Sequence, residues 1–346
     1  MKEYNNVFYF HKINPIGGVE SFFYYLSQVY KDMVVFYKEA DSKQIERLAQ
    51  NIEVHKYKEP IKCKNFFCNY GYDINVEADN YYHMVHYDAM NVGFTPMVND
   101  NFKYIGVSKV ACKSFEEKTD NKCELIYNVV PIKKKGLEKY DDKLHLISCT
   151  RLSAEKGGER IKKLAKMLDD LGIDYKWTIY TNKSRFLVDS KNVEIKEQSL
   201  DLYDEIEKSH WLVQLSSCES FGLSVCEALI LGTPVIITDL EAFKEIGCKH
   251  GKNACICNLD MTNVDLDLIV KGIKKFDYTP PKSEWSKFLD KKGNYDPNDL
   301  VEVRPLRNYT DLVLNEYVYR NRIYKMTKAR ASYLEAKGLV EVLYGI

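Results

Sequence analysis

Two glutamates, Glu219 and Glu227, lie eight residues apart around the segment Ser-Phe-Gly-Leu. The residues after Glu219 have the apolar pattern of a helix that begins near Ser220. The first turn of a helix carries backbone N–H groups without intrahelical partners, and these groups attract an anion such as a phosphate. Gly222 would let a ligand approach the backbone closely. The segment 219–227 therefore predicts an anion site flanked by two carboxylates.

The two carboxylates differ in position relative to this helix, and we expect them to differ in role. Glu227 lies inside the helix, where it can accept two hydroxyl hydrogen bonds, as from a ribose. Glu219 precedes the helix and can reach the hydroxyls of a sugar carried by the phosphate. The other residues of the predicted site stand at the helix start: Ser220, Phe221, Gly222 and Leu223. A capped surface helix with incidental acids is the alternative, which the surrounding S-F-G and A-L-x-x-G-T-P-V pattern disfavours.

A second charged element, CTRLSAEKGGERI at residues 149–161, directly follows a predicted strand at 144–149. It contains Arg151 and Lys156. The carboxyl ends of parallel strands meet at one edge of a sheet, so we expect both cations to face the same edge as the 219–227 segment. Solvated surface charge is the alternative interpretation of this pair.

Together, the two segments resemble the donor-binding motifs of family 4 glycosyltransferases, and the resemblance extends over about residues 7–275. It implies a metal-independent, retaining glycosyltransferase of the GT-B type. Such an enzyme moves a hexosyl or N-acetylhexosaminyl group from a nucleotide sugar, most often UDP-linked, to an acceptor hydroxyl. In the family, the positions of Arg151 and Lys156 clasp the donor diphosphate, and that of Glu219 binds sugar hydroxyls. Cations and helix N–H groups would stabilise the charge that develops on the leaving group.

Weaker matches to the same family lie in the first half of the chain. Gly17 and Gly18 resemble its N-terminal glycine loop, which approaches the donor phosphate and the acceptor. His86 occupies the position of a residue close to the transferred sugar; a buried strand histidine is the alternative. The resemblance thus implies four catalytic residues: His86, Arg151, Lys156 and Glu219. Near Glu245 the sequence departs from the family, because Glu241-Ala242-Phe243 replaces the usual glycines.

We expect neither a metal nor a cofactor beyond the nucleotide sugar, which is a substrate. The acidic pairs Asp141-Asp142 and Asp169-Asp170 lie in a charged linker and at a helix end, so neither resembles the metal-binding pair of a strand end. Because the resemblance gives Glu219 a hydroxyl-binding role, front-face attack is favoured over a carboxylate nucleophile. The departing phosphate oxygen would take the acceptor proton.

The elements that must position these residues alternate between short apolar strands and amphipathic helices, which predicts α/β folding with parallel sheets. We expect a GT-B architecture of two Rossmann-like doubly wound domains that face each other across a cleft, with a small C-terminal α+β extension. The predicted units are an acceptor domain at residues 1–140, a nucleotide-sugar domain at 141–299 and the extension at 300–346. The charged stretch 133–143 is the expected exposed hinge.

The extension has alternating apolar residues at its start and an amphipathic helix at 329–337, stopped at Gly338. Its T-x-x-R-A-x-x-L-x-x-x-G-x-V pattern resembles small proteins of tailed-phage structural operons. The resemblance implies that residues 301–346 dock on a phage structural protein, so that the acceptor would be a virion protein or a cell-wall polymer. An extension that packs on the first domain through Leu334, Leu339 and Val342 is the alternative.

Composition excludes several classes of protein. The 346 residues are 45% hydrophobic and 29% charged, with 50 basic and 50 acidic side chains, which argues against a non-specific nucleic-acid binder. No apolar run is long enough for a spanning helix, and no signal peptide is visible, so we expect a cytoplasmic protein. The ten cysteines form no C-x-x-C pair, and we expect reduced thiols in core positions.

Two rival functions remain open at the level of sequence. A nucleotide-sugar epimerase would share the GT-B fold but would lack an acceptor site. A non-catalytic sugar-nucleotide-binding adaptor would use the extension as its working part. Product analysis with a panel of donors separates the three, because they predict transfer, epimerisation or binding alone.

Overall fold

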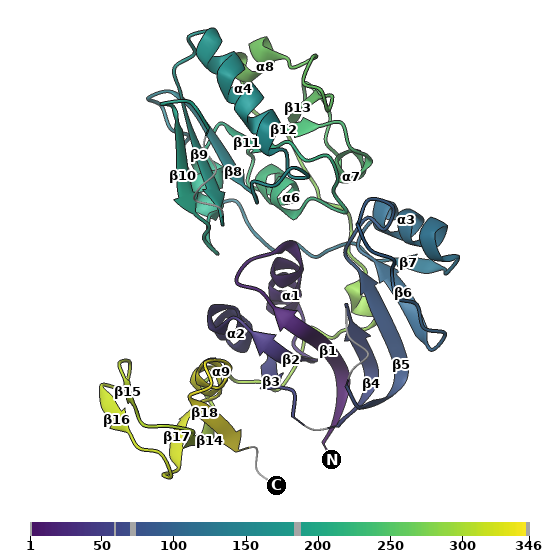
Figure 1. Cartoon of the computed structure of the whole chain (residues 1–346), viewed down its shortest axis with the longest axis vertical. Coiled ribbons are helices and arrows are strands. Elements are labelled where there is room, and N and C mark those ends of the chain that lie inside the picture. Colours follow the sequence, from purple (N-terminus) through teal and green to yellow (C-terminus); the bar gives the residue numbers. More distant parts are fainter. Residues whose placement is uncertain (1, 59, 70–73, 183–187, 344–346) are drawn as a thin grey trace.

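The computed structural model describes residues 2–58, 60–69, 74–182 and 188–343. Two parallel sheets with flanking helices lie one above the other in Figure 1, and a small antiparallel unit lies beside the lower sheet. The predicted pair of Rossmann-like α/β domains with a C-terminal α+β extension is therefore confirmed.

The first domain contains a seven-stranded sheet in the order β3-β2-β1-β4-β5-β6-β7, and every pair is parallel. Its strands are β1 (Glu3–Ile13), β2 (Met33–Ala40), β3 (Glu53–Lys56), β4 (Ile61–Cys68), β5 (Val76–Val85), β6 (Phe102–Gly106) and β7 (Cys123–Leu125). The helices are α1 (Gly18–Val29), α2 (Ser42–Ala49) and α3 (Lys109–Thr119).

The second domain contains a six-stranded parallel sheet in the order β10-β9-β8-β11-β12-β13. Its strands are β8 (Leu144–Cys149), β9 (Tyr175–Thr181), β10 (Val193–Glu197), β11 (Trp211–Gln214), β12 (Val235–Thr238) and β13 (Ala254–Cys257). The helices are α4 (Gly158–Asp170), α5 (Tyr203–Lys208), α6 (Leu223–Ile230), α7 (Glu241–Glu245) and α8 (Leu266–Lys271). Strand β8 has the predicted bounds, 144–149.

The linker between the domains is mostly exposed, as expected of a hinge, but it is anchored to the second domain. The buried carboxylate of Glu207 accepts hydrogen bonds from the backbone N–H groups of Lys135, Gly136 and Leu137 at 2.6–2.9 Å. Bonds from N–H groups to a carboxylate are stronger than neutral ones, so α5 fixes where the linker enters the second domain.

After α8 the chain returns to the first domain. The indole of Trp285 is fully buried there, with its ring centroid 5.6–6.0 Å from those of Phe8, Phe22 and Phe67. The proline pair at 280–281 is followed by a single 3-10 turn at Trp285–Lys287. The predicted second domain, 141–299, thus includes a segment that packs in the core of the first.

The extension is a three-stranded antiparallel sheet in the order β17-β14-β18, with one helix and a protruding hairpin (Figure 1). Its elements are β14 (Leu300–Pro305), β15 (Tyr309–Asp311), β16 (Glu316–Val318), β17 (Tyr324–Thr327), α9 (Lys328–Ala336) and β18 (Val340–Leu343).

The extension packs on the first domain through α9 and α2, as the packing alternative expected. The contact is partly apolar, because Ala329 belongs to the core cluster of the first domain and Ala336 packs against it, and partly polar. Lys58 Nζ lies 2.7 Å from the buried carboxylate of Glu335, and Ser332 Oγ donates to the carbonyl of Val54. The expectation that Leu334 and Val342 would cover the first domain is wrong, because both lie in the extension's own core.

All ten cysteines are free thiols, and seven of them are buried. None of the helices in the described part of the chain has the length and apolar character needed to traverse a bilayer.

Replacing Trp285 with alanine should destabilise the first domain, because it removes an indole that packs against three phenylalanine rings. We expect a loss of about 3–5 kcal/mol in the free energy of unfolding, measured by urea denaturation. Leu259→Ala, at a half-exposed residue of the second domain, is the control and should change it by less than about 0.5 kcal/mol. Equal effects of the two substitutions would contradict the assignment of Trp285 to a core.

Candidate active site between the two sheets

The loops that follow the strands of the two sheets meet in a contact between the domains. Ser220 Oγ donates to the carbonyl of His86 at 2.8 Å, and the hydroxyl of Ser108 donates to the carbonyl of Ser220. Nearby, the carboxylate of Glu245 accepts from the backbone N–H of Lys109 at 2.6 Å and from that of Val110 at 3.3 Å. A side chain of the second domain thus caps the first turn of α3 in the first domain.

Helix α6 begins at Leu223, three residues later than the sequence suggested. Gly222 precedes it with φ 87°, and a Cβ there would lie 2.7 Å from the ring of Phe243, so this position requires glycine. The side chain of Phe221 is buried in the core and that of Ser220 lies in the domain contact. The unpaired N–H groups of the anion site therefore belong to the turn that starts at Leu223.

The glycine loop of the first domain lies against this helix start. A Cβ at Gly18 would stand 3.9 Å from Leu223 Cδ1, although the two residues are more than 200 positions apart. Gly17 caps α1, and the carboxylate of Glu20 secures the loop by accepting from the backbone N–H of Asn14 at 2.8 Å. The fold thus places Gly18 next to the start of α6, and the donor-binding role of Gly17 and Gly18 stays a prediction.

Lys156 and Glu219 form an ion pair at 2.8 Å, and their side chains are only 19% and 12% exposed. The same carboxylate oxygen of Glu219 accepts from Ser216 Oγ at 2.8 Å and from Gln214 Nε2 at 3.2 Å. Ser216 and Gln214 were not predicted, although both stand at the end of the predicted strand. Three donors on one oxygen fix where this carboxylate lies in the cleft.

Arg151 is placed at the same edge of the sheet but is not part of this cluster. Its guanidinium lies 3.0 Å from the carboxylate of Glu155 and is mostly exposed. An exposed pair of this kind contributes little to stability, so the Arg151 side chain can turn toward an anion at small cost.

Glu227 is partly buried, and a hydrogen-bond partner of its carboxylate comes from the other domain. Tyr25 on α1 donates its hydroxyl to Glu227 Oε1 at 2.6 Å, and the hydroxyls of Tyr25 and Tyr203 lie 2.8 Å apart. Burial raises the pKa of the Glu227 carboxyl, while the hydrogen bond from Tyr25 opposes that rise. Neither tyrosine is among the predicted site residues. Tyr25 lies on α1, and its partner Glu227 is 202 residues away in the chain.

His86 lies beside the same contact, with its ring centroid 4.8 Å from that of Phe22. Its Nε2 is buried and has no hydrogen-bond partner in the described structure. Burial lowers the pKa of His86 to about 3, and the neighbouring His83 adds to the effect. The imidazole is therefore neutral at physiological pH and keeps one ring nitrogen available to a ligand.

A cavity of about 690 Å³ opens beside Glu219 between the domains. Its first-domain wall includes Asp88, Asn91 and Lys109, and its second-domain wall includes Glu241. Asp88 was not predicted as a site residue, yet it stands three residues after β5 and accepts from its own turn at Met90 and Asn91. The wall of the cavity next to Glu219 thus carries both acidic and basic side chains, which can bind hydroxyl groups.

Within the described ranges, no cluster of three or more His, Cys, Asp or Glu side chains is arranged to hold a metal ion. The two acidic pairs of the sequence have structural partners. Asp142 lies 2.7 Å from His145, and Asp169 accepts from the hydroxyl of Tyr175 and the amide of Asn192.

Residues 129–276 match the family model of glycosyl transferases group 1. A comparison with curated protein sequences finds no match. The solved structure of Anabaena Alr3699/HepE in complex with UDP-glucose is similar, with a TM-score of 0.58, 14% identity and coverage of 77% of this chain and 90% of that chain. A glycosyltransferase from Rickettsia africae gives a TM-score of 0.57 at 11% identity, covering 78% and 89%. WaaG, a glycosyltransferase involved in lipopolysaccharide biosynthesis, gives 0.52 at 13%, covering 77% and 88%.

These similarities confirm the predicted GT-B fold. The matched range of the family model includes Arg151, Lys156, Glu219 and Glu227. Family 4 membership, the phage resemblance of the extension and the individual residue roles stay predictions.

The two buried histidines should make the protein less stable in acid. Burial lowers the pKa of His83 to about 4 and that of His86 to about 3, whereas an unfolded histidine titrates near 6.5. As the pH falls below about 6.5, only the unfolded chain takes up these protons, so the free energy of unfolding decreases. Between pH 7 and pH 5 we expect a loss of about 1–2 kcal/mol for each histidine, measured by urea denaturation. His86→Asn should remove the part of this pH dependence that comes from His86. An unaltered pH profile in that variant would contradict the assignment of a neutral, buried imidazole to His86.

Proposed function

We propose that this protein transfers a glycosyl group from a nucleoside-diphosphate sugar to an acceptor hydroxyl. The observation that carries the proposal is the ion pair of Lys156 and Glu219 at 2.8 Å, beside the N-terminus of α6 and the cavity. It brings a diphosphate-binding cation and a hydroxyl-binding carboxylate to one point of a GT-B cleft. The UDP-glucose complex of Anabaena HepE, a structure of the same fold, is consistent with such a donor.

The diphosphate would bind the first-turn N–H groups of α6, with Lys156 and Arg151 as its cations. Lys156 would exchange its contact with Glu219 for a phosphate oxygen. Ser216 and Gln214 would still hold the Glu219 carboxylate, which then accepts from hydroxyls of the donor sugar. The glycine loop at Gly18, close to Leu223, leaves backbone room for the phosphates.

His86 and Glu227 would bind the donor on either side of the phosphates. A neutral His86 can accept or donate one hydrogen bond to a sugar hydroxyl, and it does not act as an acid near pH 7. Glu227 would accept from the ribose hydroxyls, and these would compete with the hydroxyl of Tyr25. Donor binding would therefore loosen one of the hydrogen bonds between the domains.

The proposed transfer retains the anomeric configuration. The acceptor hydroxyl attacks the anomeric carbon from the side on which the diphosphate leaves, so one carbon–oxygen bond forms as the other breaks. The proton of the hydroxyl passes to the departing phosphate oxygen. Lys156, Arg151 and the α6 N–H groups stabilise the charge on that leaving group, which is the role that a metal ion plays in other transferases.

UDP is the proposed donor nucleotide and a hexose or N-acetylhexosamine the proposed sugar, with no cofactor or metal. A virion protein or a cell-wall polymer as the carrier of the acceptor hydroxyl stays a prediction from the sequence alone. The epimerase alternative is disfavoured by the cavity beside Glu219, which has room for an acceptor.

Transfer should depend on the two cations and not on added metal. We expect Lys156→Ala and Arg151→Ala each to lower turnover about 100-fold, because each removes charge stabilisation from the transition state. The assay follows sugar transfer from a panel of nucleotide sugars in excess EDTA. Lys166→Ala, at an exposed lysine on α4 of the same domain, is the matched control. Unchanged turnover in the Lys156 variant, or an absolute requirement for Mn²⁺ or Mg²⁺, would refute this arrangement of the phosphate site.

Calorimetry with UDP alone should distinguish the roles of Glu219, Glu227 and Tyr25. Glu227→Ala should weaken UDP binding, whereas Glu219→Ala should leave it nearly intact and impair transfer, since only Glu227 faces the ribose. Tyr25→Phe should tighten UDP binding about 2- to 10-fold, because the carboxylate loses a competing donor worth about 0.5–1.5 kcal/mol. Equal losses in both glutamate variants, or weaker binding in Tyr25→Phe, would exclude the ribose role of Glu227.

A further inference from the structure

The hairpin β15–β16 carries three consecutive aliphatic residues at its tip. The side chains of Leu312, Val313 and Leu314 are 86%, 72% and 46% exposed. Leu306 and Ile323, at the base of the hairpin, are also about half exposed. A contiguous exposed apolar patch of this kind marks an interaction surface, whereas single exposed apolar residues are ordinary.

The tip is held in this conformation by a buried ion pair. Asp311 Oδ1 accepts from the backbone N–H groups of Val313 at 3.0 Å and Leu314 at 3.2 Å, and from Arg330 Nη2 on α9 at 2.7 Å. The Asp311 side chain is fully buried. Asn315 closes the turn with φ 53°. The aliphatic side chains are thus directed into water by a fixed backbone.

Tyrosines and arginines surround the base of this tip. Tyr317 and Tyr319 are about half exposed, and the guanidinium of Arg322 lies 4.8 Å from the ring centroid of Tyr319. In residues 306–324 the exposed charges are three arginines, Arg307, Arg320 and Arg322, and one carboxylate, Glu316, so their sum is 3 − 1 = +2. From its tip to its base, the hairpin carries aliphatic residues, then tyrosines, then arginines. This order matches the hydrocarbon core, the interface and the anionic headgroups of a bilayer.

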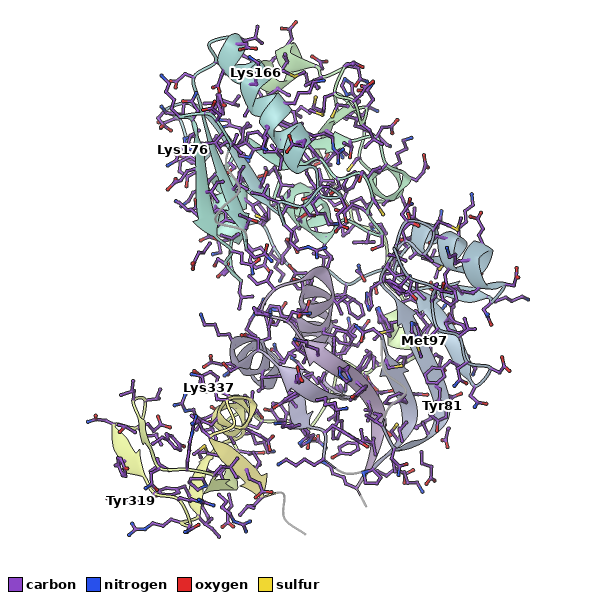
Figure 2. All side chains as sticks on the ribbon, in the orientation of Figure 1. Tyr81, Met97, Lys166, Lys176, Tyr319 and Lys337 are labelled. Atoms are coloured by element: carbon purple, nitrogen blue, oxygen red, sulfur yellow. The ribbon has the colours of Figure 1, made fainter. Side chains whose placement is uncertain are left out.

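We propose that the β15–β16 hairpin is a membrane contact that inserts Leu312, Val313 and Leu314 into the interface of an anionic lipid bilayer. In Figure 1 the hairpin lies at the outer edge of the extension, on the side away from the first domain, and Figure 2 shows Tyr319 at that edge. A protruding convex tip enters a fluid surface readily, whereas a protein partner would need a matching pocket. The inference concerns a surface remote from the cleft and does not rest on the proposed transfer reaction.

The test measures binding of the full chain to vesicles by co-sedimentation. We expect binding to phosphatidylcholine vesicles that contain about one-third phosphatidylglycerol, and weak binding to pure phosphatidylcholine. Leu312→Ser combined with Val313→Ser should lower the partition constant about 10-fold or more. Arg320→Gln combined with Arg322→Gln should weaken only the salt-sensitive part of the binding. The matched control, Leu259→Ser combined with Val270→Ser, changes two half-exposed apolar residues of the second domain and should bind as the native chain does.

A second measurement places a reporter in the tip itself. The three native tryptophans are fully buried, so Val313→Trp adds the one indole exposed to water. Its emission should shift to the blue on anionic vesicles, and bromine-labelled lipids should quench it. Failure of the native chain to bind anionic vesicles, or binding that survives the Leu312 and Val313 substitutions, would overturn the proposal. Concentration-dependent self-association lost in that variant, without vesicle binding, would instead make the hairpin a protein interface and would also overturn it.

Discussion

Every strand in the two large sheets runs parallel to its neighbours, so all the carboxyl ends of a sheet lie along one edge. Parallel strands need crossover connections, and several loops at that edge, including those after β1, β8 and β11, lead into a helix. The residues of the cleft follow from this constraint: the glycine loop comes after β1, His86 after β5, Arg151 after β8 and Glu219 after β11. Their separation along the chain has no bearing on their separation in space once two such edges face each other.

Carboxylates fix the segments that meet at these edges. Glu20 secures the glycine loop, Glu207 the linker, and Glu245 the first turn of α3 across the domain boundary. Glu227 accepts a hydrogen bond from Tyr25 of the first domain. One of the cross-domain contacts, that of Glu227 with Tyr25, uses a carboxylate that the proposed donor would also need, so donor binding would compete with this contact. Because the same carboxylate would serve both contacts, donor binding would change how the two domains are held together.

The sequence predicted what depends on local pattern. The bounds of β8 and the positions of Lys156 and Glu219 follow from apolar runs and from the residues next to them. The start of α6 was misplaced because Gly222 adopts a left-handed conformation and Phe221 turns into the core, which the helical pattern does not indicate. Trp285 and Tyr25 escaped notice because their environment is made by residues more than 200 positions away. Contacts between residues so far apart in the chain depend on tertiary packing, and the periodicity of the sequence does not indicate them.

The extension is attached to the first domain, whereas most of the predicted donor-binding residues lie in the second. Its helix α9 packs on α2 and is joined to the first domain by the pair of Lys58 and Glu335, so it belongs to that domain mechanically. The second domain carries Lys156, Glu219 and the α6 start, and in Figure 1 the described part of the extension lies beside the first domain, away from the second. A surface bound by the extension would therefore hold the first domain, with its side of the cavity, in place. The second domain could still move against it, because the linker at residues 133–143 is mostly exposed and is bonded to that moving part.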